Sequence, residues 1–256
     1  MAETLFALTR HEYGSYADLL TLIALSEYRV CYIDEIDPAS DNAYIIPVRN
    51  GELPEAGYPD ARARLIHWCF EWDQYPAMPG INEVWYPDTW AAKQYGGRYV
   101  PIGGDDRLNT HAPVGAAPDY DIAFMGYMVG SRPEVRKAML DRGLSVSPTS
   151  SWGSDRHAIL TRSRIYGMVH QFADKPTMPV LRLVVAAAYR LPFFTQTVHD
   201  VGIYRYGVMQ AALPYFAEFV AMWAGDSSPM LDNYGWSLHS HLCQDFTFRK
   251  SVEAAL

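Results

Sequence analysis

The chain has 256 residues, of which 49% are apolar and 20% are charged, and its formal net charge at pH 7 is −8. This length and apolar content predict one large domain or two small ones with a buried core, and they argue against a disordered chain. The acidic balance and the lack of a basic block argue against nonspecific attraction to nucleic acid, so a nucleic acid partner would need a local patch.

The cysteines and the apolar runs predict a soluble, unexported protein of the cytoplasm. Cys31, Cys69 and Cys243 are far apart and lie in apolar surroundings, which is typical of reduced packing residues. The first residues, MAETLFALTRHE, show no basic start followed by an apolar run. No later window has the roughly 18 uninterrupted apolar residues of a membrane span, so we expect no membrane partner.

Residues 1–110 are predicted to form a small α/β unit. Short apolar runs rich in β-branched and aromatic residues are separated by Pro, Gly and Asp, which is typical of buried strands and turns. Strands are expected at 4–9, 29–34, 42–48, 64–70 and 83–87, and a buried helix at 16–27. Residues 103–118, GGDDRLNTHAPVGAAP, have no apolar period and are the best linker candidate.

Residues 111–203 are predicted to form a second α/β unit. Strand and helix segments alternate at 121–126, 132–142, 144–148, 155–163, 164–171, 179–190 and 191–197. Such alternation implies right-handed crossovers and a parallel sheet, with functional loops at the carboxyl ends of the strands. The expected fold is therefore α/β, with two Rossmann-like, doubly wound parallel-sheet units that face a cleft.

The C-terminal residues 204–256 are expected to be helices that pack across both units. Residues 207–225, GVMQAALPYFAEFVAMWAG, are predicted to form a long apolar helix with a kink at Pro214. An aromatic, His-containing tail follows.

The junction between 121–126 and the next helix carries the clearest helix start of the chain. Ser131 and Glu134 have the S-x-x-E spacing of a capping box, Pro133 lies in the first turn, and Gly143 ends the helix.

The same junction can receive an anion. Gly126 ends the strand and Gly130 precedes the cap, so backbone amides can approach a ligand closely, and the helix dipole favours negative charge there. Arg132 adds a guanidinium suited to phosphate. An ordinary strand-to-helix turn would use similar residues, and the pattern matches neither the Walker motif nor G-x-G-x-x-G.

Other residues with binding chemistry are expected at the same sheet edge. Trp152 and Gly153 open the next helix, His170 follows a strand, and Arg182 lies where another helix begins. An aromatic ring for a base, glycines and arginines for phosphates, and a histidine for a hydroxyl or phosphate form the outline of a nucleotide site.

The order DIAFMG...R, WG...R...L..SRI...H and LRL..AAA...P resembles the donor-binding half of GT-B glycosyltransferases, especially the spore-maturation-type group common in phages and bacteria. The resemblance is clearest over about 120–200 and extends over 1–110 through RLIHWCFEWD and EVWYPDTWAAKQYGGRYVPIGG. It implies a nucleotide-sugar donor on the second unit and an acceptor presented by the first. The donor-binding residues that we expect are Gly126, Gly130, Ser131, Arg132, Trp152, Gly153, Arg156, His170, Arg182 and Thr195.

The chain departs from that family at two places where a carboxylate is often found. The helix after Arg182 has Val184 and Val185 instead, and the strand after it ends in Thr195 and Gln196. Donor recognition can therefore be altered, or activity lost.

Glycosyl transfer needs a base for the acceptor proton and positive charge or amide dipoles for the departing diphosphate. The candidates for the base are His11 and Glu12 in one loop and Glu71 and Asp73 in another, because both loops follow apolar strands. Aromatic neighbours could raise the pKa of Glu71. Each of these residues could equally be an ordinary loop residue.

No metal site is expected. Asp34, Glu35 and Asp37 suit a solvated strand end, and His239, His241 and Cys243 lack a second ligand cluster for zinc. No cofactor is expected beyond a nucleoside-diphosphate sugar as co-substrate.

These observations favour a metal-independent glycosyltransferase that moves a hexosyl or related sugar. The alternatives are a noncatalytic nucleotide or nucleotide-sugar binding protein and, less well supported, a nicotinamide-dependent oxidoreductase, which lacks its dinucleotide motif here. A modified DNA base, a protein and a glycan all stay open as acceptors.

Overall fold

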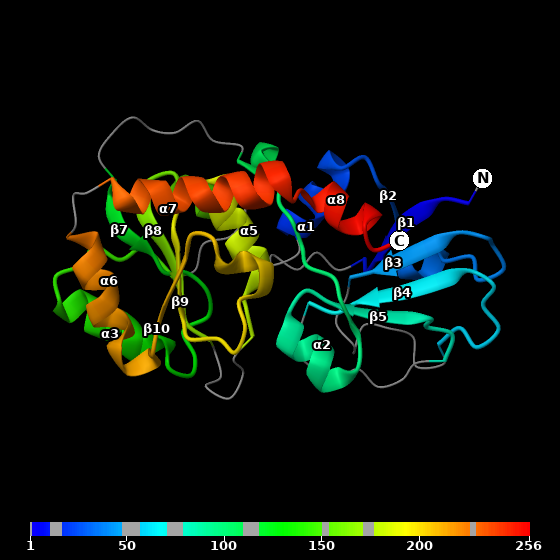
Figure 1. Ribbon diagram of the computed structural model, residues 1–256, viewed down its shortest axis with the longest axis horizontal. Helices are drawn as coiled ribbons and strands as arrows, with labels where there is room; N and C mark the ends of the chain where they lie inside the picture. The colour runs from blue at the N-terminus through cyan, green and yellow to red at the C-terminus, as the bar shows by residue number, and fades with distance from the viewer. Residues whose placement is uncertain are drawn as a thin grey trace. The chain divides into compact units, whose positions relative to one another are not determined.

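The computed structural model describes residues 2–10, 17–47, 57–70, 79–109, 118–149, 154–170, 177–225 and 229–256. The chain forms two compact units, one of Met1–Ile102 with Phe248–Leu256 and one of Gly103–Thr247 (Figure 1). Each unit has its own parallel sheet, with six strands in the first and four in the second. The expected α/β class with two parallel-sheet units is confirmed.

The first unit is a parallel sheet with the strand order β2-β1-β3-β4-β5-β6. Its strands are β1 (Thr4–Leu8), β2 (Arg29–Tyr32), β3 (Ala43–Ile46), β4 (Arg64–Trp68), β5 (Glu83–Tyr86) and β6 (Arg98–Tyr99). Phe6, Ile45 and Ile66 on the inner strands are fully buried, which is why these strands appear in the sequence as continuous apolar runs. At the edge, β2 is mostly exposed.

Two helices of the first unit follow strands. Helix α1 (Ala17–Leu25) buries Leu19, Leu22 and Ile23. Helix α2 (Thr89–Tyr95) begins at Asp88, whose side chain accepts a hydrogen bond from the Ala91 amide, and ends at a glycine with a positive φ.

The last residues of the chain complete the core of the first unit. Helix α8 (Phe248–Glu253) brings Phe248, which is fully buried, to within 5.9 Å of the rings of both Phe6 and Trp68, measured between centroids. The core of this unit thus depends on residues that are separated by about the whole length of the chain.

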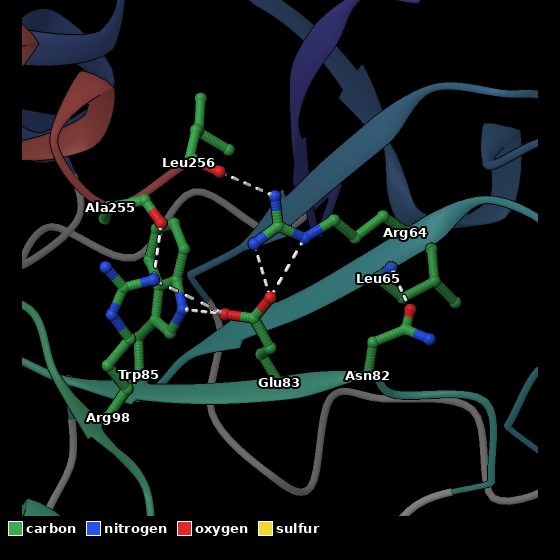
Figure 2. A network of polar contacts seen from close by, with 8 residues as sticks. All are labelled: Arg64, Leu65, Asn82, Glu83, Trp85, Arg98, Ala255 and Leu256. Carbon is green, nitrogen blue, oxygen red and sulfur yellow. Dashed lines mark hydrogen bonds and ion pairs between the residues drawn. The ribbon is translucent and has the colours of Figure 1, made fainter.

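Two arginines on the sheet hold the backbone that follows α8 (Figure 2). Arg64 Nη1 donates to the carbonyl oxygen of Leu256 at 3.1 Å, and Arg98 Nη1 donates to that of Ala255 at 2.6 Å. Glu83 lies between the arginines, accepts a hydrogen bond from Arg64 Nε at 3.0 Å and is 3.8 Å from Arg98 Nη1.

This network affects the ionisation of Glu83. Burial alone would raise the pKa of the carboxyl, but hydrogen bonds from Trp85 and Arg64, with the charges of Arg64 and Arg98, keep it below its ordinary value. The carboxylate is therefore the favoured form in the folded unit.

The second unit is a parallel sheet with the strand order β10-β9-β8-β7. Its strands are β7 (Tyr120–Ala123), β8 (Ser163–Met168), β9 (Phe193–Gln196) and β10 (Val208–Ala211). Its helices are α3 (Arg132–Asp141), α4 (Ser154–Leu160), α5 (Val180–Ala188), α6 (Phe216–Ala224) and α7 (Met230–His239).

One buried cluster joins this sheet to helices α3 and α6. Ile122 and Phe194 from the sheet pack with Met139 of α3 and with Phe216 and Val220 of α6.

Among the described residues, no helix has the length and apolarity needed to cross a membrane.

The prediction of one long helix over 207–225 is wrong. Residues Val208–Ala211 form strand β10, which pairs in parallel with β9, and α6 begins only at Phe216. Pro214 lacks an amide hydrogen and disfavours helical backbone before it, so the segment 208–211 extends the sheet instead of the helix.

Two other expectations of local structure need correction. Residues 144–148 do not form a strand, because only Val146 makes a bridge, to Ile122. Ser131 does not cap α3: its backbone is already helical, with φ −77° and ψ −11°, and its side chain makes no capping hydrogen bond.

The grouping of the chain also differs from the expected three parts. Residues 103–109, which were included in the linker candidate, belong to the second unit, and residues 110–117 lie outside the described residues. The C-terminal region is divided between the units at 247/248, because β10 and α7 belong to the second and α8 to the first.

Candidate functional site

The candidate site lies at the carboxyl edge of the second sheet. Gly126 follows β7, His170 follows β8, and Thr195 and Gln196 are the last residues of β9. Parallel strands bring their carboxyl ends to one edge, so these positions, distant in sequence, become neighbours there. Arg182 joins them from the first turn of α5.

Gly126 is the place where the backbone and two arginines approach most closely. Its φ is +120°, and a Cβ added to it would lie 2.8 Å from Arg182 Nη2 and 3.4 Å from Arg132 Nη1. Its amide donates to the Thr149 carbonyl at 2.9 Å. Only glycine has both the conformational freedom and the space for this arrangement.

Both guanidinium groups are held by backbone carbonyl groups at strand ends. Arg132 donates from Nε to Val169 O at 2.9 Å and from Nη1 to Tyr127 O at 3.1 Å. Arg182 Nη1 donates to Met125 O at 2.6 Å. In the part of the chain that the structure describes, neither guanidinium contacts a carboxylate. Their charges are therefore fixed in position and not neutralised by a protein anion.

The charge of Arg182 acts on Arg132. Burial lowers the pKa of Arg132 to about 10, and the nearby charge of Arg182 adds to this effect. Arg132 still carries its proton at neutral pH, in a place where only 5% of the residue is exposed. An anion at this position would gain from both charges.

His170 is the third member of the cluster. Its amide donates to Gln196 Oε1 at 2.9 Å, and its carbonyl accepts a hydrogen bond from Ser131 Oγ at 3.4 Å. Its imidazole is buried, and Nε2 has no hydrogen-bond partner. Burial, followed by the charges of Arg132 and Arg182, lowers the pKa of His170 to about 4.

The remaining predicted donor residues differ in their surroundings. Thr195 is fully buried, and its Oγ1 has no hydrogen-bond partner. Arg156 is buried on α4, and Gly130 has a φ of +61° in the exposed turn before α3. Six of the predicted site residues lie outside the described residues: His11, Glu12, Glu71, Asp73, Trp152 and Gly153.

Gln196 has a role that the sequence did not indicate. In the sequence it is only the residue that replaces a carboxylate, whereas in the structure its side chain accepts a hydrogen bond from the backbone amide of His170. The positions Val184 and Val185, where a carboxylate was sought, are both buried in the apolar interior. No signal in the sequence could have paired residues 170 and 196, because the contact depends on adjacent strands.

The groups considered for metal binding have other partners. Asp34 and Glu35 accept hydrogen bonds from Arg10 at 3.0 and 3.2 Å. His239 Nδ1 donates to the Ala187 carbonyl at 3.0 Å. Across the described ranges, no three His, Cys, Asp or Glu side chains gather as a metal-ligand set.

No known protein-family model and no curated protein sequence matches the chain. Solved structures do. AviGT4, a glycosyltransferase involved in avilamycin A biosynthesis, has 10% sequence identity and a TM-score of 0.64, with 99% of this chain and 96% of AviGT4 covered. The DNA-modifying enzyme β-glucosyltransferase, whose substrate is uridine diphosphoglucose, has 10% identity and a TM-score of 0.58, with 99% and 98% covered.

The chain has the GT-B glycosyltransferase fold.

A third match is TarM, with 9% identity and a TM-score of 0.60. It covers 87% of this chain but 55% of TarM, so the chain spans about half of TarM's length. At these identities the likeness concerns the fold alone. The GT-B fold agrees with the family resemblance seen in the sequence, while the narrower spore-maturation-type group stays a prediction.

Proposed function

We propose that this protein is a metal-independent glycosyltransferase that moves a sugar from a nucleoside-diphosphate sugar to an acceptor. The observation that carries the proposal is the pair of guanidinium groups of Arg132 and Arg182 at Gly126, which contact no carboxylate in the described part of the chain. Two adjacent positive charges, with Arg132 buried and Arg182 half-buried, are costly without an anion, so a ligand with two negative charges is the natural partner.

A diphosphate ester fits this requirement. Each phosphate of a nucleotide sugar carries one negative charge, and the unbonded N–H groups of the two arginines can donate to its oxygens. When the sugar departs, one more negative charge develops on the diphosphate, and positive groups that are already in position stabilise it without reorganisation. Metal independence in this proposal rests on these fixed charges.

The other roles follow the same proposal. Trp152 and Gly153 would border the nucleotide, and Gly130, Ser131, Arg156, His170 and Thr195 complete the donor-binding set. Glu71, His11 and Glu12 are the candidates for the base that takes the acceptor proton.

The similar structures support a nucleotide-sugar donor, since AviGT4 is a glycosyltransferase and the β-glucosyltransferase uses uridine diphosphoglucose. The acceptor is a modified DNA base, a protein or a glycan. The net charge of −8 argues mildly against DNA. The spore-maturation-type group of phages and bacteria remains the proposed subgroup.

Incubation with a panel of nucleotide sugars, followed by measurement of the released nucleoside diphosphate, tests the proposal. We expect release with at least one donor, and its loss in Arg182→Ala. Arg142→Ala is the matched control, because this arginine lies exposed at the far end of α3 and should not affect release. Release that survives Arg182→Ala would contradict the assigned site.

A second function, a noncatalytic nucleotide-sugar binding protein, is favoured by one observation. Val184 and Val185 are buried and cannot present a polar group to a donor, and Gln196 is engaged with the backbone of His170. Tight binding of a nucleotide sugar without release, with or without acceptors, would support this function over the enzyme.

A further inference from the structure

We propose that His170 is a proton-coupled contact for the donor: its imidazole is neutral in the free protein and takes up a proton when the diphosphate binds. This inference rests on the proposed function and concerns the chemistry of the same site. It assigns to His170 a role that the two arginines do not have, because they carry their charge whether or not a ligand is bound.

The geometry of the free protein favours the neutral imidazole. His170 is 6% exposed, and its Nε2 is buried with no hydrogen-bond partner. The charged groups that act on it are Arg132 from α3 and Arg182 from α5, both positive. From β9, the neutral side-chain amide of Gln196 accepts a hydrogen bond from the His170 backbone. A proton added to this buried imidazole would create a third positive charge beside the buried Arg132 and the half-buried Arg182.

An unpartnered buried nitrogen has a cost that a ligand can remove. Buried polar atoms are nearly always hydrogen-bonded, so the free Nε2 beside two cations indicates a group that is completed by a negatively charged acceptor. With a diphosphate present, the two guanidinium charges are compensated. The repulsion that opposes protonation then becomes an attraction to phosphate oxygen, and N–H···O⁻ bonding fixes the proton on Nε2.

The proton uptake and the pH dependence of donor affinity follow from the rise in the pKa of His170 on binding. In the free protein the pKa of His170 is about 4, so almost none of it is protonated at pH 6. Nearby opposite charges typically raise such a pKa by about 1–3 units, and a rise of about 2–3 units would bring the bound-state pKa to about 6–7. Binding at pH 6 should then take up about 0.5–0.9 proton per site, and the donor should bind roughly 10- to 100-fold more tightly at pH 5 than at pH 8.

The direction in which donor affinity changes with pH depends on whether the free or the bound state has the higher pKa for His170. Because the bound state holds the proton more tightly, affinity rises as the pH falls below the bound-state pKa and levels off near the free-state value of about 4. Above the bound-state pKa the affinity is low and constant.

Isothermal titration calorimetry with UDP-, GDP- and ADP-linked glucose at pH 6, in two buffers of different ionisation enthalpy, tests the inference. These probes are suitable because both phosphates are esterified and do not titrate in this range, whereas a terminal phosphate has a pKa near 6. We expect proton uptake in the wild-type protein and none in His170→Asn, which keeps a polar side chain but cannot take the proton. His239→Asn is the matched control, since His239 is an equally buried imidazole on α7 that bonds to a backbone carbonyl.

The outcomes separate the two proposals. Binding of a nucleotide sugar without proton uptake, or uptake that persists in His170→Asn, would overturn the role of His170 and leave the proposed function standing. Failure of every probe to bind would overturn the proposed function and this inference together. Should His170→Asn not fold, histidine NMR spectra of the wild-type protein at pH 6 decide: a neutral imidazole that becomes protonated on donor addition supports the inference, and an unchanged one refutes it.

Discussion

Replacement of Gly126 by alanine should weaken donor binding in addition to lowering the stability of the fold. The new methyl group would lie 2.8 Å from Arg182 Nη2, closer than real Cβ contacts, and 3.1 Å from Nη1, so the guanidinium must move. Movement weakens its bond to Met125 O and removes one or two charge-assisted hydrogen bonds to a ligand, each worth about 1.5–3 kcal/mol. We expect a loss of about 3 kcal/mol in donor binding, on the order of a 100-fold increase in Kd.

The backbone of Gly126 adds a second cost, because a φ of +120° strains any residue with a Cβ by about 1–3 kcal/mol. Gly143→Ala is the matched control for this strain: its φ is +79°, and a Cβ there would meet nothing within 4 Å. Calorimetric titration with a nucleotide sugar and urea denaturation should therefore show reduced stability in both variants but reduced donor affinity in Gly126→Ala alone. Equal donor affinity in the two variants would refute the assignment of the anion site to this turn.

Two further predictions concern the first unit. Phe248→Ala removes a fully buried ring stacked on a tryptophan and should lower the free energy of unfolding by about 3–5 kcal/mol, measured by tryptophan fluorescence in urea. The control Tyr215→Ala, at a residue that is 65% exposed, should change this free energy by less than about 0.5 kcal/mol. A small effect of Phe248→Ala would show that the C-terminal segment is not part of this core. Because the folded-state pKa of Glu83 lies below its ordinary value, its contribution is fully present above the unfolded pKa near 4.5 and is lost as the pH falls through the folded-state pKa. Glu83→Gln should therefore be less stable than the wild type at pH 7 and approach it in acid denaturation curves below pH 4, and a constant difference across this range would contradict the network with Arg64.

Local patterns predicted most of the strands because the sheets are parallel. A strand that is buried on both faces reads as a short apolar run, as in β1, β3 and β4. The same reasoning failed for residues 208–211. The apolar segment that contains them has a helix-like composition, but all four residues pair in parallel with β9 and form the edge strand of the second sheet.

The helix start at residue 131 shows a second limit of local patterns. Ser131 and Glu134 have the spacing of a capping box, yet the Ser131 hydroxyl is used by the carbonyl of His170, 39 residues away. A tertiary hydrogen bond thus replaced the local one. Sequence spacing alone cannot weigh one against the other.

The sequence by itself determined the α/β class, the alternation of strands and helices in the second unit, and the sheet edge at which Gly126, His170 and Arg182 meet. These properties follow from burial periodicity and from the rule that parallel strands end on the same edge. Only the tertiary structure decided that residues 248–256 complete the first unit and that Gln196 accepts a hydrogen bond from the His170 backbone. It also decided that carbonyl groups at strand ends accept hydrogen bonds from some N–H groups of Arg132 and Arg182, while other N–H groups of the same side chains stay available to a ligand. The physical reason is that such contacts join residues far apart in the chain, so they depend on how the elements pack and leave no periodic trace in the sequence.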